Sequence, residues 1–190
     1  MKKKLLILLP LCLLLAGCGP SKREAVQGYY AGIQSAQMAA QIVVHLPQAD
    51  HCFGVAATYD REEGSTVTLT EPEALRGLSA TMTGEEMRLL YDGSVWPAGD
   101  GGRLSAASCL PLLLYAAGEG FVTREGTDKI DGQEYIFLTT EASDKAGGEF
   151  ACTLWVYPDG FAPYAAELSR EGQVLLTVNF TQFSCDRAEN

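Results

Sequence analysis

The stretch "EFACTLWVYPDGFAPYAAELSREGQVLLTVNFTQF", residues 149–183, decides the fold that we expect for this chain. It holds two runs, 149–157 and 174–183, in which apolar residues occupy every second position. Because successive side chains of a strand point to opposite faces, each run predicts a strand with one apolar face. The apolar sets are Phe150, Cys152, Leu154 and Val156 in the first run, and Val174, Leu176, Val178 and Phe180 in the second. The segments "YPDG" (157–160) and "REG" (170–172) place a glycine where a chain reversal needs positive φ, so we expect hairpins here.

The same texture extends back to about Ile42. Short stretches that alternate apolar with polar or small residues are separated by turn sequences, at "DREEG" (60–64), "YDG" (91–93) and "IDG" (130–132). This pattern is typical of an antiparallel sheet with one covered face.

Two helices are expected beside the sheet. Apolar residues at three- and four-residue steps predict an opening helix near residues 24–38. Its apolar positions are Val26, Tyr29, Tyr30, Ile33, Ala36 and Ala40. Within residues 105–120, Pro111 fits the first turn of a short helix whose leucines and Tyr115 pack inward. No repeat or second linker interrupts the chain, so we expect one α+β domain, mostly β, over residues 26–190.

The N-terminus has the layout of a secretory signal. Lys2, Lys3 and Lys4 precede an apolar run over residues 5–15, which is shorter than the roughly 20 residues of a transmembrane helix. The following "LAGC" (15–18) resembles the bacterial lipobox, which implies that residues 1–17 are removed and that Cys18 carries a diacylglycerol. We therefore expect residues 18–25 to form a lipidated tether. The protein is expected on the extracytoplasmic face of a bacterial membrane, with the cell membrane as the first choice. A permanent N-terminal span, or ordinary cleavage that leaves Cys18 as a free thiol, are the alternatives.

The charge balance excludes some partners. Without the three signal lysines, 11 of the 14 basic residues remain against 24 acidic ones. Such an acidic chain disfavours binding to nucleic acid and a polybasic grip on anionic lipid. Attachment to the membrane is therefore expected to depend on the acyl group.

No catalytic motif stands out. The two histidines, His45 and His51, bracket the turn that we expect at "LPQAD" (46–50) and lie outside any HExxH pattern. The glutamate pairs at 62–63 and 85–86 read as solvated charge, and "GDGG" (99–102) reads as a turn because it lacks the setting of a phosphate loop. We expect no enzymatic activity, no cofactor and no metal. The large aromatic residues Trp96 and Trp155 either fill a core or meet a partner or an acyl chain.

Five segments, taken in order, carry a resemblance to a known family: "LTEPEALRGLSATM" (69–82), "LLYDG" (89–93), "CLPLLLYAAGEG" (109–120), "LWVYPDGFAPYAAEL" (154–168) and "VLLTVNFTQF" (174–183). Together they resemble the LolA/LolB/LppX-like lipoproteins of the outer-membrane-lipoprotein-sorting class, and in particular the GerS-like germination and sporulation lipoproteins of spore-forming anaerobes. The resemblance implies a strongly curved, incompletely closed antiparallel β-barrel with the N-terminal and mid-chain helices on its concave face. In transport members of the class that concavity receives acyl chains of a lipid or lipoprotein.

Two functions are therefore expected as alternatives. The chain either binds a hydrophobic ligand or partner in a concave cavity, or it is a non-enzymatic, GerS-like envelope interaction protein whose cavity is filled by its own side chains. Side-chain alternation nominates five residues for the inner face, with plain core packing as the other role of each: Leu89, Leu154, Val156, Val178 and Phe180.

Four cysteines follow Cys18, and an even number outside the cytosol allows three disulfide connectivities. Cys152 shares the apolar face of its strand and Cys109 precedes inward-packing leucines, whereas the alternation places Cys52 and Cys185 on polar faces. A disulfide cannot cross a sheet, because its Cβ atoms lie about 4 Å apart. The pattern thus favours Cys52–Cys185 with Cys109–Cys152.

Overall fold

The computed structural model describes residues 21–84, 86–100, 103–144 and 146–188. The expected signal peptide, Cys18 and the first residues of the tether lie outside the described residues. Within them, no helix is both long and apolar enough to cross a membrane.

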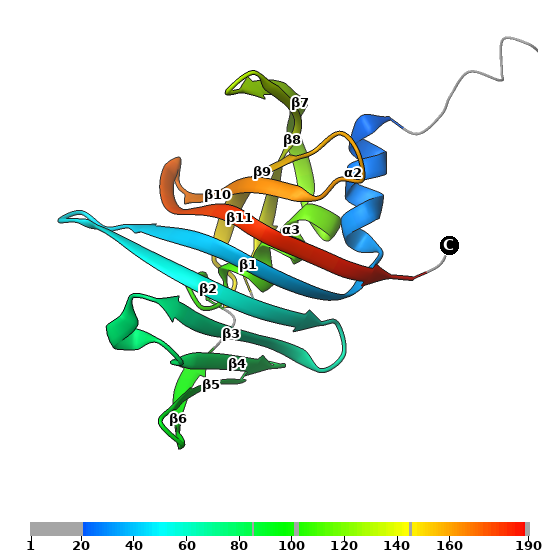
Figure 1. Ribbon diagram of the computed structural model, residues 1–190. Coiled ribbons are helices and arrows are strands. Elements are labelled where there is room, and N and C mark those ends of the chain that lie inside the picture. The colour runs from blue at the N-terminus through cyan, green and yellow to red at the C-terminus, as the bar shows by residue number, and fades with distance from the viewer. Residues whose placement is uncertain (1–20, 85, 101–102, 145, 189–190) are drawn as a thin grey trace, which may run out of the picture.

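Eleven strands form one antiparallel sheet in the order β6-β5-β4-β3-β2-β1-β11-β10-β9-β8-β7. The sheet is strongly curved and does not close, so β6 and β7 are its two edges (Figure 1). Its strands are β1 (Ile33–His45), β2 (Asp50–Asp60), β3 (Gly64–Glu71), β4 (Ser79–Thr83), β5 (Glu86–Tyr91), β6 (Ser94–Asp100), β7 (Phe121–Ile130), β8 (Gln133–Ser143), β9 (Glu149–Val156), β10 (Pro163–Arg170) and β11 (Gln173–Arg187). Each half of the chain is a meander, and β1 and β11 join the two halves in the middle of the sheet.

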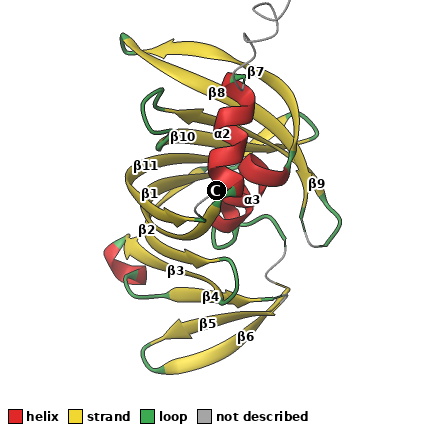
Figure 2. Cartoon of the chain, turned by 90° about the vertical axis from the view of Figure 1, so that its right-hand side faces the viewer, coloured by secondary structure: helices red, strands yellow, loops and turns green. Residues whose placement is uncertain are grey.

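Two helices, α2 (Lys22–Ala31) and α3 (Cys109–Glu119), pack against each other on the inner side of the curved sheet (Figure 2). A short 3-10 helix, η1 (Glu73–Leu75), follows β3. The helices cover the half of the sheet that runs from β1 to β8, whereas the wing formed by β3 to β6 extends beyond them (Figure 2). The core is the layer between helices and sheet, and its most buried large side chains include Tyr30, Ile42, Leu110, Leu113 and Leu168.

The expected fold class is confirmed: the described chain is mostly β, with an unclosed, curved antiparallel sheet and helices on its concave side. The turns expected at 60–64, 91–93, 130–132, 157–160 and 170–172 each connect two strands. Gly64 shows why one of them needs glycine, because its φ is +106° and an added Cβ would lie 2.1 Å from the backbone oxygen of Met82.

The opening helix is shorter than expected. It ends at Ala31, and β1 begins at Ile33, so the prediction of a helix to residue 38 was wrong. Ser21 begins the helix with a capping box in which its hydroxyl accepts from the Glu24 N–H while the Glu24 carboxylate accepts from the Ser21 N–H. After Gly32 the apolar residues Ala36, Met38 and Ala40 recur at every second position, as a strand requires.

Tyr115 also departs from the expectation for the mid-chain helix. Pro111 does lie in the first turn of α3, and the leucines of the helix are buried. Tyr115 itself is 50% exposed and faces away from the core.

The expected disulfides are absent from the described chain, in which Cys52, Cys109, Cys152 and Cys185 are all free thiols. A β-bulge in β11 explains the error for Cys185. Ala40 pairs with Phe180 but Ala39 pairs with Gln182, so Thr181 is an extra residue that reverses the alternation beyond it. Cys185 therefore lies on the core side, where its sulfur is 3.3 Å from the Tyr29 hydroxyl. Cys52 remains on the outer face and donates to the Gln41 side chain, so the two cannot meet.

Candidate ligand-binding cleft

The layer under the helices is closed. Leu154, Val156 and Val178 are at most 2% exposed and belong to the core. Phe180 and Leu89 are half-buried, Phe180 against the same core and Leu89 on the β5 wing. We identify five clefts in the described part of the chain, and none of these five residues lines any of them.

Two adjoining clefts lie beside α3, and the larger one is where the helix faces the turn between β2 and β3. Its volume is about 620 Å³, within the range of small-molecule sites. The apolar wall comes from Tyr59, Met82, Pro111, Leu112 and Tyr115. The polar part of the lining is Asp60, Arg61, Glu62, Ser65, Ser108, Ser143 and Asp144. The cleft thus combines an apolar wall with a polar rim, which suits a ligand that has an apolar body and a polar end.

A second cleft of about 500 Å³ continues along the C-terminal half of α3. It shares Tyr59, Arg61 and Tyr115 with the first cleft. The Arg61 guanidinium lies 3.6 Å from the Glu119 carboxylate, so an exposed ion pair joins the β2–β3 turn to the end of α3. Exposed ion pairs of this kind contribute about 0–1 kcal/mol to stability, so this pair holds the β2–β3 turn to α3 only weakly.

Asp144 fixes the polar end of the first cleft. Its buried carboxylate accepts from the backbone N–H groups of Gly148, at 2.7 Å, and Leu104, at 3.3 Å, and from the Arg170 guanidinium at 3.0 Å. Burial by itself raises the pKa of Asp144, but the two N–H groups and the Arg170 charge outweigh it and hold that pKa below its ordinary value. Asp144 therefore links the β8–β9 turn to the segment before α3, and these hydrogen bonds stabilise the fold.

Asp60 shapes the facing turn. Its Oδ1 atom accepts from the N–H groups of Glu62, at 2.8 Å, and Glu63, at 2.9 Å. These backbone bonds lower the pKa of the Asp60 carboxyl and keep it ionised at the rim. The arrangement holds Arg61 where it reaches α3.

Apolar, hydroxyl-bearing and charged side chains line the two clefts. The residues that line the two clefts include neither histidine nor cysteine. Ser108 is buried, and its hydroxyl donates to the carbonyl of Arg103 rather than to a base. Across the described residues no group of three or more metal-ligating side chains converges.

The two histidines lie far along the sheet from α3, at the β1–β2 turn. His45 uses one ring nitrogen toward Asp50, at 3.1 Å, and the other toward the Thr177 hydroxyl, at 2.9 Å. His51 is exposed. Both histidines therefore lie in the strands that flank the turn, His45 at the end of β1 and His51 near the start of β2.

The two tryptophans lie on different parts of the sheet. Trp96, on the edge strand β6, is 47% exposed. Trp155, on β9, is half-buried on the outer face and its indole N–H donates to the Asp128 carboxylate at 3.3 Å.

Sequence reasoning did not identify the cleft residues Tyr59, Arg61, Met82 and Asp144. They come from three separate hairpins and meet only because the sheet curves around α3. The one local signal is the "DREEG" turn, which marks the position of Arg61 but not what it faces.

Neither a protein-family model nor a curated protein matches the sequence. Solved structures do resemble it in overall shape. A LolA superfamily protein from Nitrosomonas europaea is 16% identical, with 86% of this chain and 92% of that chain covered, at a TM-score of 0.45. An uncharacterized conserved protein from Thermus thermophilus is 12% identical, covering 86% and 85%, at 0.49. The lipoprotein LppX of Mycobacterium tuberculosis is 17% identical, covering 87% and 96%, at 0.42. At these identities the likeness is one of architecture alone.

Proposed function

We propose that this chain is a lipid-anchored, extracytoplasmic bacterial protein that binds a hydrophobic ligand, such as an acyl chain of a lipid or lipoprotein, in the cleft beside α3. The anchor is supported by the "LAGC" sequence at 15–18, after a cationic and then apolar leader. Mass spectrometry of the N-terminal fragment tests it: a diacylglyceryl group on Cys18 is expected, and an unmodified thiol there would contradict the anchor.

The cleft itself carries the binding proposal. It offers about 620 Å³ beside the closed core, with the aromatic and aliphatic side chains of Tyr59, Met82, Leu112 and Tyr115 on its wall. Burying a ligand's methylene groups against such a wall contributes about 0.8 kcal/mol for each group. The ionised rim at Asp60 and Arg61 remains available to the polar end of the same ligand.

Tyr115→Ser tests this proposal, because the side chain is half exposed and its loss leaves the core intact. Purified, delipidated protein is titrated with a fluorescent fatty acid, and the variant is expected to bind about tenfold more weakly, as the loss of about 1.4 kcal/mol of apolar contact implies. Tyr91→Ser is the matched control, since Tyr91 is 40% exposed on the β5–β6 hairpin, outside the cleft. Equal affinity of the two variants, or no binding to the unmodified protein, would contradict the cleft as a lipid site.

A second function is supported by the closed core. Because Leu154, Val156 and Val178 are fully packed under the helices, the deeper concavity is filled by the chain itself. This favours the alternative of a non-enzymatic, GerS-like envelope protein that acts by holding a protein partner. Native mass spectrometry distinguishes the two: a retained lipid supports the carrier, whereas a lipid-free protein that captures a defined envelope protein in a pull-down supports the alternative.

A further inference from the structure

The tether between anchor and domain is shorter than the expected residues 18–25, because α2 already begins at Lys22. Only Gly19 and Pro20 separate Cys18 from Ser21, the first described residue. Three extended residues span roughly 10 Å, so a lipid on Cys18 keeps Ser21 close to the headgroups. This inference rests on the anchor of the proposed function.

Ser21 is rigidly joined to the rest of the domain. The capping box starts α2 at this residue, and Val26 and Tyr30 are buried in the core. The Tyr30 hydroxyl donates to the carbonyl of Phe161 in the β9–β10 loop at 2.9 Å. Holding the start of α2 at the membrane therefore fixes which end of the molecule faces it.

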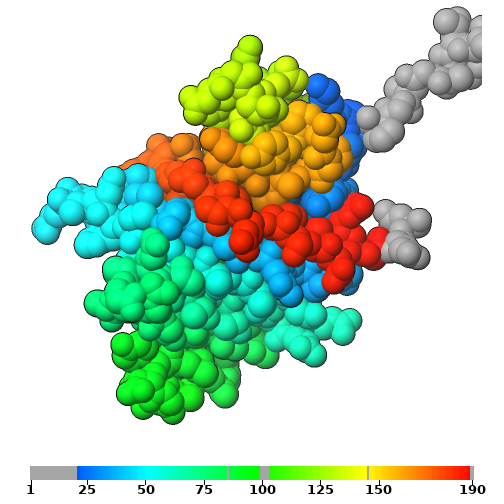
Figure 3. Space-filling view, viewed as in Figure 1, coloured from blue at the N-terminus to red at the C-terminus, as the bar shows by residue number. Residues whose placement is uncertain are grey.

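That end also carries the β7–β8 hairpin. Figures 1 and 2 share a vertical axis, and both place the start of α2 and the β7–β8 hairpin at the top and the β5–β6 hairpin at the bottom. In the space-filling view the β7–β8 hairpin forms the upper rim and the β5–β6 hairpin the lower end (Figure 3). The two hairpins thus occupy opposite ends of the domain.

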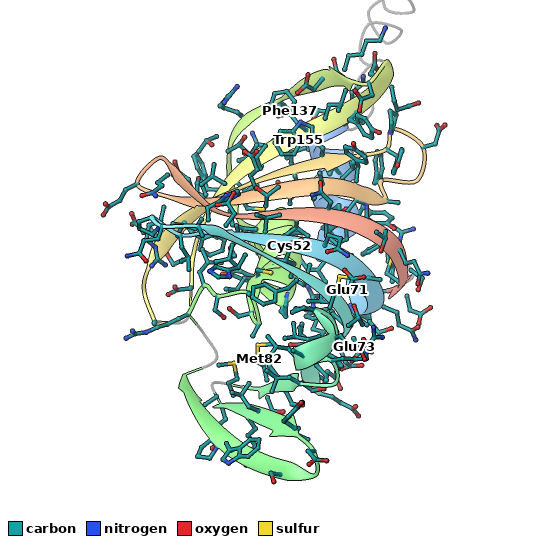
Figure 4. All side chains as sticks on the ribbon, turned by 60° about the vertical axis from the view of Figure 1, so that its left-hand side comes forward. Cys52, Glu71, Glu73, Met82, Phe137 and Trp155 are labelled. Carbon is teal, nitrogen blue, oxygen red and sulfur yellow. The ribbon has the colours of Figure 1, made fainter. Side chains whose placement is uncertain are left out.

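The outer face of the sheet is aromatic at the anchor end. Phe137 and Trp155 lie directly opposite each other on β8 and β9, near the end where the chain enters α2 (Figure 4). Beside them, Tyr135 stacks on Tyr164 with ring centroids 4.2 Å apart, and Tyr157 packs at 5.3 Å from Tyr135. Tyr135 is only 5% exposed, so Phe137, Trp155, Tyr157 and Tyr164 supply the accessible surface of these five residues, which we call the aromatic patch.

The rest of the outer face is different. Over β1 to β3 and β11 it is lined by small and neutral polar residues: Gln37, Ala39, Ala56, Thr58, Thr66, Thr68, Gln182 and Ser184. Tyrosine and tryptophan are enriched where protein meets the headgroup region, because each has an apolar body and a polar handle. The aromatic patch therefore lies on the outer surface nearest to the anchor, while Tyr91 and Trp96 expose a second aromatic surface on the β5–β6 hairpin at the opposite end. The short tether from Cys18 brings the first of these surfaces, and not the second, to the membrane.

We propose that the aromatic patch rests in the headgroup region of the membrane that holds Cys18, and that the β5–β6 hairpin with Trp96 points away from that membrane. The hairpin tip beside the patch carries three acidic residues, Asp128, Asp131 and Glu134, against the single basic residue Lys129, which disfavours contact with anionic lipid. The contact is therefore made with neutral headgroups and is insensitive to salt.

The two tryptophans of the chain report the two ends separately, which gives a matched pair of variants. Trp96→Phe leaves Trp155 as the only indole, and Trp155→Phe leaves Trp96. The full chain is produced in a bacterial host, purified from membranes in detergent and placed in phosphatidylcholine vesicles that carry a lipid with a headgroup-level nitroxide quencher. Far-ultraviolet circular dichroism and the urea midpoint confirm that each variant folds.

Trp155 fluorescence is expected to be quenched several-fold more than Trp96 fluorescence, at low and high salt alike. If Trp155→Phe does not fold, subtracting the signal of Trp96→Phe from that of the unaltered chain supplies the Trp96 value. Equal quenching, stronger quenching of Trp96, or no quenching of Trp155 overturns the orientation. An acylated Cys18 fragment together with unquenched Trp155 refutes the orientation alone, whereas an unacylated fragment refutes both anchor and orientation.

Discussion

At the scale of single residues, Gly118 determines how closely the two helices pack. It is buried in α3, and a Cβ at this position would lie 2.8 Å from the backbone nitrogen of Ala31 and 2.9 Å from its Cα. Both atoms belong to backbone and cannot move aside. The contact between α2 and α3 therefore requires a residue without a side chain.

Gly118→Ala is expected to lower the free energy of unfolding by about 1–3 kcal/mol, because the added methyl forces the helices apart. Gly28→Ala is the matched control. Gly28 is an exposed position of α2 with no atom within 4 Å of an added Cβ, so alanine there should stabilise by about 0.5–1 kcal/mol. Urea unfolding measures both changes, and equal effects of the two substitutions would contradict the close contact.

Asp144 gives a second residue-scale prediction, in its dependence on pH. Asn at this position loses charge-assisted hydrogen bonds to two N–H groups and Arg170, and should cost about 1–3 kcal/mol at pH 7. Because the folded-state pKa of Asp144 is lowered, its stabilisation is present above the unfolded pKa of about 4 and disappears as the pH falls through the folded value.

The difference in stability between the unaltered protein and Asp144→Asn should therefore stay constant from pH 7 to about pH 4 and shrink below it. Urea titrations across this range measure it. A difference that stays unchanged down to pH 2 would show that the carboxylate charge does not stabilise the folded state.

At the scale of elements, the bulge in β11 sets the environment of Cys185. Cys185 is half-buried beside Tyr29, whereas Cys52 is exposed on the outer face and Cys109 and Cys152 are fully buried. Burial raises the pKa of Cys109 and of Cys152 to about 12, so neither forms a thiolate near neutral pH.

Iodoacetamide at pH 8 should therefore label Cys52 first, Cys185 more slowly, and Cys109 and Cys152 only after unfolding. Peptide mapping by mass spectrometry follows the order. Deleting Thr181 removes the extra residue but leaves Cys185 opposite Ala36 on the core side, so Cys185 should still be labelled more slowly than Cys52. Labelling of Cys185 in this variant at the rate of Cys52 would contradict the bulge. Rapid labelling of Cys109 in the folded protein would contradict the closed core.

The sequence predicted those features of the elements that have a local signal. The hairpin turns followed from glycines after acidic residues, and the apolar face of β9 and that of β11 from Leu176 to Phe180 followed from alternation. A register shift beside Leu175 breaks the alternation, so Leu175 rather than the predicted Val174 packs against the core. The boundary between α2 and β1 was misjudged because Ile33, Ala36 and Ala40 satisfy a helical spacing, although tertiary pairing of β1 with β2 and β11 makes them a strand. The bulge at Thr181 has no such signal, and this is why the face of Cys185 was mispredicted.

The cleft could not be predicted for a different reason. Its wall combines Tyr59 from β2, Met82 from β4 and Leu112 from α3. Their proximity depends on strand order and on the curvature of the sheet, and no periodicity within one segment encodes either.

At the scale of the whole molecule, the last strand is central rather than peripheral. Among the described strands, β11 lies between β1 and β10, and its pairing with β1 joins the two halves of the sheet by hydrogen bonds. Removing it exposes two strand edges and splits the core. The integrity of the sheet thus depends on the final strand of the chain.

A chain that ends at Gly172 is therefore expected to lose cooperative unfolding altogether. A chain that ends at Ala188 is the control, because it keeps β11 and the bond from the Ala188 N–H to the Gly32 carbonyl, at 2.9 Å. Circular dichroism during urea unfolding separates the two. A sigmoidal unfolding transition in the shorter chain would show that the first ten strands fold without β11.

The route of the chain from β6 to β7 passes through α3. The helix that walls the cleft is thus also the strap between the two free edges of the sheet. Because α3 both lines the cleft and lies between β6 and β7 in the chain, we expect a ligand that shifts α3 to shift the two free edges of the sheet as well. A bound molecule would then change the positions of β6 and β7, the strands that a neighbouring protein could contact.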